Sequence, residues 1–315
     1  MPTISIIIPV HNSQKTIENC LKRIYSSNYK NFEVILVDDC SKDNSIKIAK
    51  KFKAKIIKLK TNSGAAAARN AGIKAAKGKY TLFIDSDVLI EKDTVKNLLS
   101  SIKSRKADAV LAIYTKQPYY NNFISTYHNL FQIYTFFEQP SSASETFPGF
   151  STACSIIKTD IIKKFSFNQN SIVEDMELGN ILIKNNYKIY LDKSIKVQHC
   201  HLYTFKKTIK HYFKRTRGWI KMLKSQKINS ISKATHFNIS SLISIPSAFL
   251  FFLSLMFIDT FIPFTFLLLF VLSNIGFYKF LLKEKGLLFA LQSIFLSLIL
   301  NIIIGIGILA GLIKQ

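Results

Sequence analysis

The chain has 315 residues, with 43 Lys and Arg against 19 Asp and Glu, so its formal net charge is +24. A hydrophobic fraction of 48% with only 20% charged residues excludes an intrinsically disordered chain, and the length allows about two domains. The N-terminus has no cationic start followed by a long apolar run, which excludes an ordinary secretory signal peptide. Four scattered cysteines without a CxxC pair favour reduced thiols in the cytosol.

Up to about residue 114, short β-branched runs alternate with segments whose apolar residues recur at helical spacing. We expect strands at Ile4–Ile8, Val34–Val37, Lys55–Leu59, Tyr80–Ile84 and Ala109–Ile113. We expect helices at Lys15–Tyr25, Asn44–Phe52, Gly64–Ala76 and Thr94–Ile102. This repeat, with its nearly continuous apolar strands, predicts an α/β fold in which helices cover both faces of a parallel sheet.

Polar residues gather at the ends of these strands, where ligands of such sheets bind. The first strand ends in Pro9-Val10-His11-Asn12, Asp38 and Asp39 follow the second, and Asp85 and Asp87 follow the fourth. Neighbouring carboxylates repel one another unless a cation or a donor-rich ligand lies between them. Because Asp85 and Asp87 flank a single residue, both can turn toward one hard cation, with a diphosphate completing its coordination. The alternative is that these aspartates only cap the helices that follow.

Two familiar phosphate-binding motifs are absent from the sequence. No GxGxxG follows the first strand, and no GxxxxGK[ST] occurs anywhere. The first absence weakens a dinucleotide-dependent dehydrogenase, and the second excludes a P-loop kinase or ATPase. Something other than a glycine-rich loop must therefore neutralise any bound phosphate.

Several motifs follow one another in a set order: Ser5–Asn12, Val37–Ser45, Asn62–Gly72, Phe83–Asp87, Phe147–Phe150, Val173–Asp175 and His199. With them the chain resembles the family 2 glycosyltransferases with the GT-A fold over about the first 200 residues. Cys40 departs from the family pattern, which commonly has glycine or another small residue after the two aspartates. The resemblance implies a Rossmann-like nucleotide-diphospho-sugar transferase domain, a nucleotide-sugar donor and a divalent cation, Mn²⁺ or Mg²⁺.

The resemblance also implies roles for individual residues. The implied donor contacts are Pro9, Asp38, Asp39, Arg69 and Asp85. The implied metal ligands are Asp85, Asp87 and His199. The alternative for Arg69 is an ordinary surface residue. The run His199-Cys200-His201 does not by itself predict a structural zinc site, because alternation on a strand sends Cys200 away from the histidines and no CxxC or HxxxH partner is present.

Glu174 and Asp175 open a predicted helix and mark the acceptor side. A carboxylate in the first turn of a helix is favoured in its ionised form, which suits a base at neutral pH. Asp175 matches the base of inverting family members. Glu174 is a candidate acceptor contact, as is Gly149, where the backbone can approach a sugar ring closely. A phosphate acceptor is already ionised and needs no base, so this pair favours a hydroxyl acceptor. The alternative is N-terminal helix charge without catalysis.

Residues 116–144 are rich in polar and aromatic residues. We expect a helical insertion that lines the acceptor groove or lies against the bilayer. A purely amphipathic packing helix is the alternative.

Residues 201–238 are basic and carry no acidic residue. They predict amphipathic helices on an anionic membrane surface rather than a nucleic-acid interface, because strongly apolar segments follow directly. Family members often carry arginines near the donor diphosphate in this region, so Arg215 and Arg217 are candidates for that role. The Gln-x-x-Arg-Trp motif of processive synthases is missing, which argues against a polymerising enzyme.

Three apolar segments in residues 239–315 have about the length that crosses a bilayer. They are Ile239–Ile258, Phe261–Tyr278 and Leu287–Ile313. Lysines between the second and third place that loop in the cytoplasm by the positive-inside rule. Two spans with interfacial pieces remain the alternative to three.

The sequence thus predicts a transferase domain over residues 1–200, interfacial helices over 201–238 and a transmembrane region over 239–315. We expect an integral membrane protein with a cytoplasmic catalytic domain and membrane lipids as partners. The predicted function is an inverting, metal-dependent glycosyltransferase that moves one sugar to a hydroxyl of a membrane-associated, lipid-linked or glycan acceptor. A polyprenyl- or dolichyl-phosphate glycosyltransferase is the first alternative. A non-catalytic membrane scaffold that binds nucleotide is the second.

Overall fold

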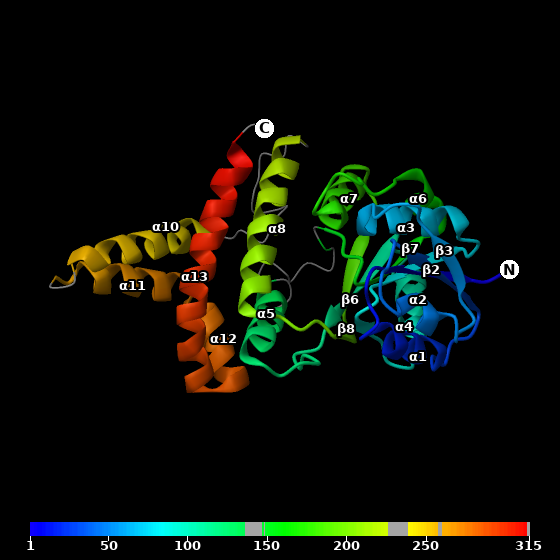
Figure 1. Ribbon diagram of the computed structural model, residues 1–315, viewed down its shortest axis with the longest axis horizontal. Coiled ribbons are helices and arrows are strands. Elements are labelled where there is room, and N and C mark those ends of the chain that lie inside the picture. The colour runs from blue at the N-terminus through cyan, green and yellow to red at the C-terminus, as the bar shows by residue number, and fades with distance from the viewer. Residues whose placement is uncertain (136–146, 148, 226–238, 258–259, 314–315) are drawn as a thin grey trace. The chain divides into compact units, whose positions relative to one another are not determined.

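The computed structural model of the protein (Figure 1) describes residues 1–135, 147, 149–225, 239–257 and 260–313. The chain forms two compact units. The first consists of Met1–Tyr120 and Pro140–His201, and the second of Asn121–Gln139 and Leu202–Gln315. The chain therefore leaves the first unit and returns to it, a discontinuity that the linear division predicted above does not contain.

The first unit is built on one mixed sheet. Its strands are β1 (Ile4–Val10), β2 (Phe32–Asp38), β3 (Lys55–Lys58), β4 (Tyr80–Ile84), β5 (Val88–Leu89), β6 (Ala109–Tyr114), β7 (Cys154–Lys158) and β8 (Ile189–His199). Their order across the sheet is β3-β2-β1-β4-β7-β6-β8-β5. The neighbours from β3 to β4 pair in parallel, so their carboxyl ends meet at one edge of the sheet.

Helices cover both faces of this sheet, as the alternation along β1 requires. Its helices are α1 (Ile17–Tyr25), α2 (Ser45–Ala49), α3 (Gly64–Ala75), α4 (Thr94–Ser104), α6 (Thr159–Lys164) and α7 (Glu174–Lys184). Ile6 and Ile8 lie in a buried cluster with residues of α1 and α4. Ile7 lies in a second cluster with residues of α3, α6 and α7. Figure 1 shows the labels of these two groups on opposite sides of the sheet.

The parallel pattern is interrupted by β7. It runs antiparallel to both of its neighbours, β4 and β6, although the sequence predicted parallel strands throughout the sheet. Apolar content alone cannot reveal strand direction, because a buried antiparallel strand has the same composition as a parallel one. β8 then runs parallel to β6 and carries its final residue, His199, opposite Val88 of β5.

The second unit is helical. Its helices are α5 (Phe123–Ile133), α8 (Phe205–Ser225), α10 (Ile239–Ser254), the 3₁₀ turn η3 (Leu255–Phe257), α11 (Ile262–Ser273), α12 (Ile275–Lys285) and α13 (Leu287–Leu312). Tyr127 and Leu130 of α5 pack in one buried cluster with Phe277 and Leu281 of α12 and with residues of α13. The predicted helical insertion is thus α5 for its described part, and residues 136–144 of that prediction lie outside the described residues.

Helix α13 packs closely on α8. A Cβ atom at Gly311 would lie 2.6 Å from the Cβ of Ile220, and one at Gly307 would lie 3.0 Å from the Cβ of Thr216. Only residues without a side chain allow two helices to approach to this distance. The part of α8 that carries Thr216 and Ile220 is therefore held against α13.

One described helix, α13, is long and apolar enough to cross a membrane. The predicted middle span, Phe261–Tyr278, consists instead of α11 and α12, which are bent by 71° and count as a second candidate only if taken as one broken span. The predicted first span contains α10, a shorter apolar helix with Pro246 inside it, and Ile258 at its end lies outside the described residues. These helices are a sign of membrane anchoring by length and composition.

Candidate active site

The ends of β1 and β2 hold the first group of predicted residues. Pro9 is opposite Val37 and Val10 is opposite Asp38 in the parallel register. The Oδ1 atom of buried Asp38 accepts a hydrogen bond of 2.9 Å from the backbone N–H of Ser41. Just beyond the strands, Asn12 and Cys40 adopt positive φ angles of 51° and 57°, a conformation uncommon for residues with a side chain. The structure thus brings Pro9 and Asp38 to one edge.

Asp39 serves the start of α3. Its two carboxylate oxygens accept hydrogen bonds of 2.7 Å from the backbone N–H of Ser63 and 2.8 Å from that of Gly64. The free N–H groups of a helix start require such acceptors, and Gly64 takes the positive φ of 86° with which the helix begins. The carboxylate of Asp39 is therefore used within the fold at the start of α3, and not at α2, the helix that directly follows it. Its predicted contact with the donor stays a prediction.

Arg69 of α3 connects the two sides of the predicted site. Its guanidinium lies 2.8 Å from Oδ1 of Asp85 and 2.7 Å from Oε1 of Glu174. The Arg69 side chain is only 6% exposed. The alternative that Arg69 is an ordinary surface residue is therefore wrong. Arg69 therefore bridges the end of β4 and the start of α7. Glu174, the candidate acceptor contact, forms an ion pair with Arg69 instead of being free for an acceptor.

One guanidinium neutralises two carboxylates incompletely in this buried place. Burial raises the pKa of Asp85, against the lowering effect of Arg69, and the nearby Asp87 charge adds to the increase. Burial and the adjacent Asp175 likewise raise the pKa of Glu174. The pKa of Arg69 is also raised, because the two carboxylates outweigh the effect of its burial. With both carboxyl groups ionised, Arg69, Asp85 and Glu174 together have one formal negative charge in excess, which favours a cationic neighbour.

Asp87 faces two histidines. Its Oδ2 atom lies 3.4 Å from Nε2 of His199 and 3.3 Å from Nδ1 of His201. Burial alone would raise the pKa of Asp87, but hydrogen bonds and charge from the two histidines hold it well below its usual value. Ligand atoms of these three side chains all lie within 4.8 Å of one another. This is the candidate metal group, and Asp85, directed to Arg69, is not part of it.

The pairing of β5 with β8 assembles this group. The backbone N–H of Cys200 donates a hydrogen bond of 2.7 Å to the carbonyl of Asp87, and His199 is opposite Val88. The imidazole rings of His199 and His201 stack with 5.6 Å between centroids, while Cys200 is buried. His201 is not among the ligands predicted from the sequence. The pattern that could have indicated it is the alternation His199-Cys200-His201, which places both histidines on one face of a strand.

The start of α7 carries Asp175, which is half-buried. Its Oδ1 atom accepts a hydrogen bond of 2.9 Å from the backbone N–H of Met176. The helix is seated on the segment before β7, since a Cβ at Gly179 would lie 2.4 Å from the backbone nitrogen of Phe150. Gly149 is buried, and a Cβ there would meet the side chain of Met176 at 3.3 Å. The close approach at Gly149 is thus made by this helix, and Pro148 lies outside the described residues.

Arg215 and Arg217 lie on α8 of the second unit. Arg215 stacks on Trp219, with 5.4 Å from the guanidinium carbon to the ring centroid. The Nε atom of Arg217 is buried without a hydrogen-bond partner in the described part of the chain. Their predicted role toward the donor diphosphate stays a prediction.

The glycosyl transferase family 2 pattern matches residues 5–166, about half of the chain. The chain belongs to glycosyl transferase family 2. Glycosyltransferase GlyG of Streptococcus pneumoniae is 34% identical over 116 residues, which are 35% of this chain and 38% of that protein. Poly(ribitol-phosphate) beta-N-acetylglucosaminyltransferase TarS of Staphylococcus aureus is 36% identical over 118 residues, 35% of this chain and 21% of that protein. The matches therefore span less than half the length of these relatives.

Solved structures share the fold. The mannosyltransferase PcManGT from Pyrobaculum calidifontis, in complex with GDP-Man and Mn²⁺, has a TM-score of 0.64 at 14% identity, over 99% of this chain and 87% of that one. Staphylococcus aureus TarS 1–349 in complex with UDP has a TM-score of 0.52 at 19% identity, over 96% and 89%. The predicted GT-A fold class is confirmed by these likenesses.

Proposed function

We propose that this chain is an inverting, metal-dependent glycosyltransferase that transfers one sugar from a nucleotide-sugar donor to a hydroxyl group of a membrane-associated acceptor. The observation that carries the proposal is that the Asp87–His199–His201 group and the Arg69 bridge meet just after β4, where Asp85 and Asp87 are two positions apart. Through that bridge, the end of β4 is tied to the helix start that bears Asp175. Family membership supplies the reaction class.

Asp175 is the proposed base. One of its carboxylate oxygens accepts the proton of the acceptor hydroxyl while the acceptor oxygen bonds to the anomeric carbon of the sugar. The bond from that carbon to the nucleoside diphosphate breaks, and its electron pair leaves with the diphosphate. The N-terminal position of Asp175 on α7 favours the ionised carboxylate that this step requires.

The three side chains of the metal group fit a divalent cation. Two imidazoles and one carboxylate, half-buried and close together, suit a transition-metal ion better than Mg²⁺, which prefers oxygen ligands and keeps its waters. We therefore favour Mn²⁺ over Mg²⁺. When bound, the cation supplies positive charge that stabilises the leaving diphosphate. Asp85 and Arg69 would position the ribose side of the donor next to it.

The proposed setting is the assembly of a cell-wall glycan on a lipid carrier. TarS, named above, is a poly(ribitol-phosphate) beta-N-acetylglucosaminyltransferase. A putative teichuronic acid biosynthesis glycosyltransferase, TuaG of Bacillus subtilis, is 33% identical over 109 residues, 33% of this chain and 43% of that protein. Helix α13 supports anchoring at a membrane.

The test uses the full chain purified in detergent. A panel of nucleotide-sugar donors is incubated with lipid-linked saccharide acceptors, with Mn²⁺ and then with a chelator, and release of nucleoside diphosphate is measured. We expect release only with the cation. Asp175→Asn should retain donor binding but lose transfer by about 10²-fold or more, as expected for loss of a positioned base.

Asp160→Asn is the matched control, since Asp160 is an exposed carboxylate in the first turn of α6. A full transfer rate in Asp175→Asn would reject the base. Mass spectrometry of the extracted lipid separates the acceptors: a sugar added to a saccharide hydroxyl supports the proposal, whereas a single sugar on polyprenyl phosphate contradicts it.

A further inference from the structure

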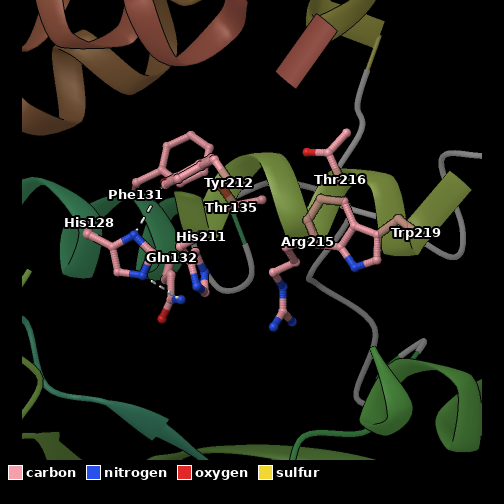
Figure 2. Close-up of a pocket in the computed structure, with 9 residues that line it drawn as sticks. All are labelled: His128, Phe131, Gln132, Thr135, His211, Tyr212, Arg215, Thr216 and Trp219. Atoms are coloured by element: carbon pink, nitrogen blue, oxygen red, sulfur yellow. Dashed lines mark hydrogen bonds between the residues drawn. The ribbon is translucent and has the colours of Figure 1, made fainter. Parts of the chain in front are cut away.

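A pocket lined by residues of the helical unit lies between α5 and α8 (Figure 2). None of the proposed steps of transfer uses it. Its lining is aromatic and basic and consists of His128, Phe131, Gln132, Thr135, His211, Tyr212, Arg215, Thr216 and Trp219. No carboxylate is among these nine residues.

The basic side of the pocket is one stripe of α8. His211, Arg215 and Trp219 follow one another at intervals of four residues, which places them on the same face of a helix. The guanidinium of Arg215 is held over the Trp219 ring at 5.4 Å. Figure 2 shows Arg215, His211 and Gln132 pointing to the same side of α5 and α8. A planar guanidinium positioned in this way can donate two parallel hydrogen bonds to one anion.

The opposite wall comes from α5 and is fixed by hydrogen bonds. Gln132 Nε2 lies 3.0 Å from Nε2 of His128, and the Tyr212 hydroxyl lies 3.3 Å from Nδ1 of the same ring. His128 is buried, and the His211 ring meets it edge to face with 5.4 Å between centroids. The pocket therefore has preformed walls, which reduces the entropy cost of binding a ligand.

Among its described residues, the helical unit has a large excess of positive charge. Among the described residues of the second unit, Glu284 is the only carboxylate side chain, against eleven cationic side chains. These are Lys206, Lys207, Lys210, Lys214, Arg215, Arg217, Lys221, Lys224, Lys279, Lys283 and Lys285. Within the part of the chain that the structure describes, half-buried Arg215 has no carboxylate partner. A partly buried cation without a counter-ion is costly, and a bound anion would remove that cost.

The neighbouring helix indicates where such an anion comes from. Thr216 and Ile220 of α8 pack on α13 at Gly307 and Gly311. Helix α13 is the described helix that is long and apolar enough to cross a membrane. An anion in the pocket would thus lie close to α13, since Thr216 both lines the pocket and faces Gly307 of α13. A phosphate ester of a lipid carries a compact anion that can accept two hydrogen bonds from one guanidinium. Its hydrocarbon chain is compatible with a membrane.

We infer that the pocket between α5 and α8 binds the phosphate group of a lipid phosphate ester, with Arg215 as its main contact and His211 and Gln132 beside it. Taking that lipid to be the acceptor's carrier rests on the proposed function, whereas the binding itself does not. The sugar is still transferred to a hydroxyl, so the phosphate here is held for recognition and undergoes no chemistry.

Binding of farnesyl phosphate to the full chain in detergent, without donor or cation, tests the inference by isothermal titration calorimetry. We expect farnesyl phosphate to bind, and farnesol and inorganic phosphate at equal concentration to bind at least tenfold more weakly. Arg215→Gln should weaken binding by about tenfold or more, the effect of losing a charge-assisted hydrogen-bond pair. Arg215→Lys should fall between, since it keeps the charge and loses the planar fork.

Lys214→Gln is the matched control, because it removes the same charge from the adjacent, exposed position on α8. His211→Gln provides a second variant should Arg215→Gln unfold, as thermal melting would show, and it should also weaken binding. Equal losses of affinity in Arg215→Gln and Lys214→Gln would show that the pocket is not the binding site. If farnesol bound as tightly as farnesyl phosphate, the phosphate group would not be recognised. If inorganic phosphate bound as tightly, the lipid chain would make no contribution. Binding of farnesyl phosphate without any sugar transfer would reject the proposed function and leave this inference standing. Sugar transfer without binding of farnesyl phosphate would reject this inference and leave the proposed function standing.

Discussion

Arg69 and Glu174, 105 positions apart in the sequence, form a buried ion pair with 2.7 Å between Nη1 and Oε1. The second amino group of the same guanidinium holds Asp85 at 2.8 Å. Helix α3, the end of β4 and the start of α7 are therefore joined through one side chain. Displacement of any one of them disturbs the residues on both sides of the proposed reaction.

Arg69→Met should destabilise the folded chain by about 3 kcal/mol, because removal of one partner leaves buried carboxylates without a counter-charge. Arg69→Lys should cost less, since an ammonium keeps the charge but cannot form both hydrogen bonds in the same geometry. Chemical unfolding measures both. Lys74→Met, at an exposed position on the same helix, should stay within about 0.5 kcal/mol of the natural chain. A loss as small for Arg69→Met would mean that the bridge contributes no stability.

Glu174→Gln should change how stability depends on pH. Burial and Asp175 raise the pKa of Glu174 in the folded chain, so on raising the pH the unfolded chain loses its proton first. Such a group contributes stability that is complete below its unfolded pKa, about 4.3, and is lost as the pH rises through the folded value. The natural chain should thus lose stability relative to Glu174→Gln as the pH rises above about 4.3 and through the raised pKa of the folded chain, measured by thermal melting. Parallel curves for the two proteins would contradict the raised pKa, and Asp160→Asn serves as the exposed control.

Mn²⁺ should bind the natural chain more tightly than Mg²⁺, because two of the three candidate ligands are imidazoles. Asp87→Asn and His201→Gln should each weaken Mn²⁺ binding by about tenfold or more, at least the cost of changing an outer-shell partner. Calorimetric titration of the metal alone gives both values. Cys200→Ser, which changes the residue between the two histidines, should keep the affinity. Unchanged Mn²⁺ binding in His201→Gln would remove that residue from the group.

Iodoacetamide at pH 8 should modify one cysteine in the folded chain and all four after unfolding. Burial raises the pKa of the Cys154 and Cys200 thiols to about 12, so almost none of either is the reactive thiolate at that pH, and burial also raises the pKa of Cys20. Cys40 is half-buried and should react. Intact mass counts the adducts, and Cys40→Ser should show none while folded. Early modification of Cys200 would show that the end of β8 opens readily.

The part of the fold that depends on local pattern was predictable. The strands at Ile4–Val10 and Tyr80–Ile84 and the helix at Gly64–Ala75 lie where the apolar periodicity predicted them, because the spacing of apolar residues along the chain favours one type of element over the other. Strand direction was not predictable for β7, since direction is set by the path of the chain between elements. The 71° bend between α11 and α12 was missed for a similar reason: hydropathy averages over a break.

The candidate site divides in the same way. Asp87 and His199 were named from their motifs, and the structure brings them within 3.4 Å. His201 was left out because a strand pattern tells which residues share a face and not what lies opposite that face. The pairing of Arg69 with Glu174 depends on the packing of α3 and α7 on one side of the sheet, which no spacing in the sequence encodes. The roles predicted for Pro9 and Asp175 stay predictions.

Helix α5 belongs to the helical unit although its residues precede β7 in the chain. Tyr127, Leu130 and Ile133 are each 2% exposed or less, and the Tyr127 hydroxyl bonds to Ser297 of α13 at 2.8 Å. A recombinant fragment stopping at His201 would keep this helix and discard everything that covers it, so bare aromatic and aliphatic surface would drive such a product into inclusion bodies. Anyone seeking a soluble catalytic piece should delete residues 121–139 as well as the tail.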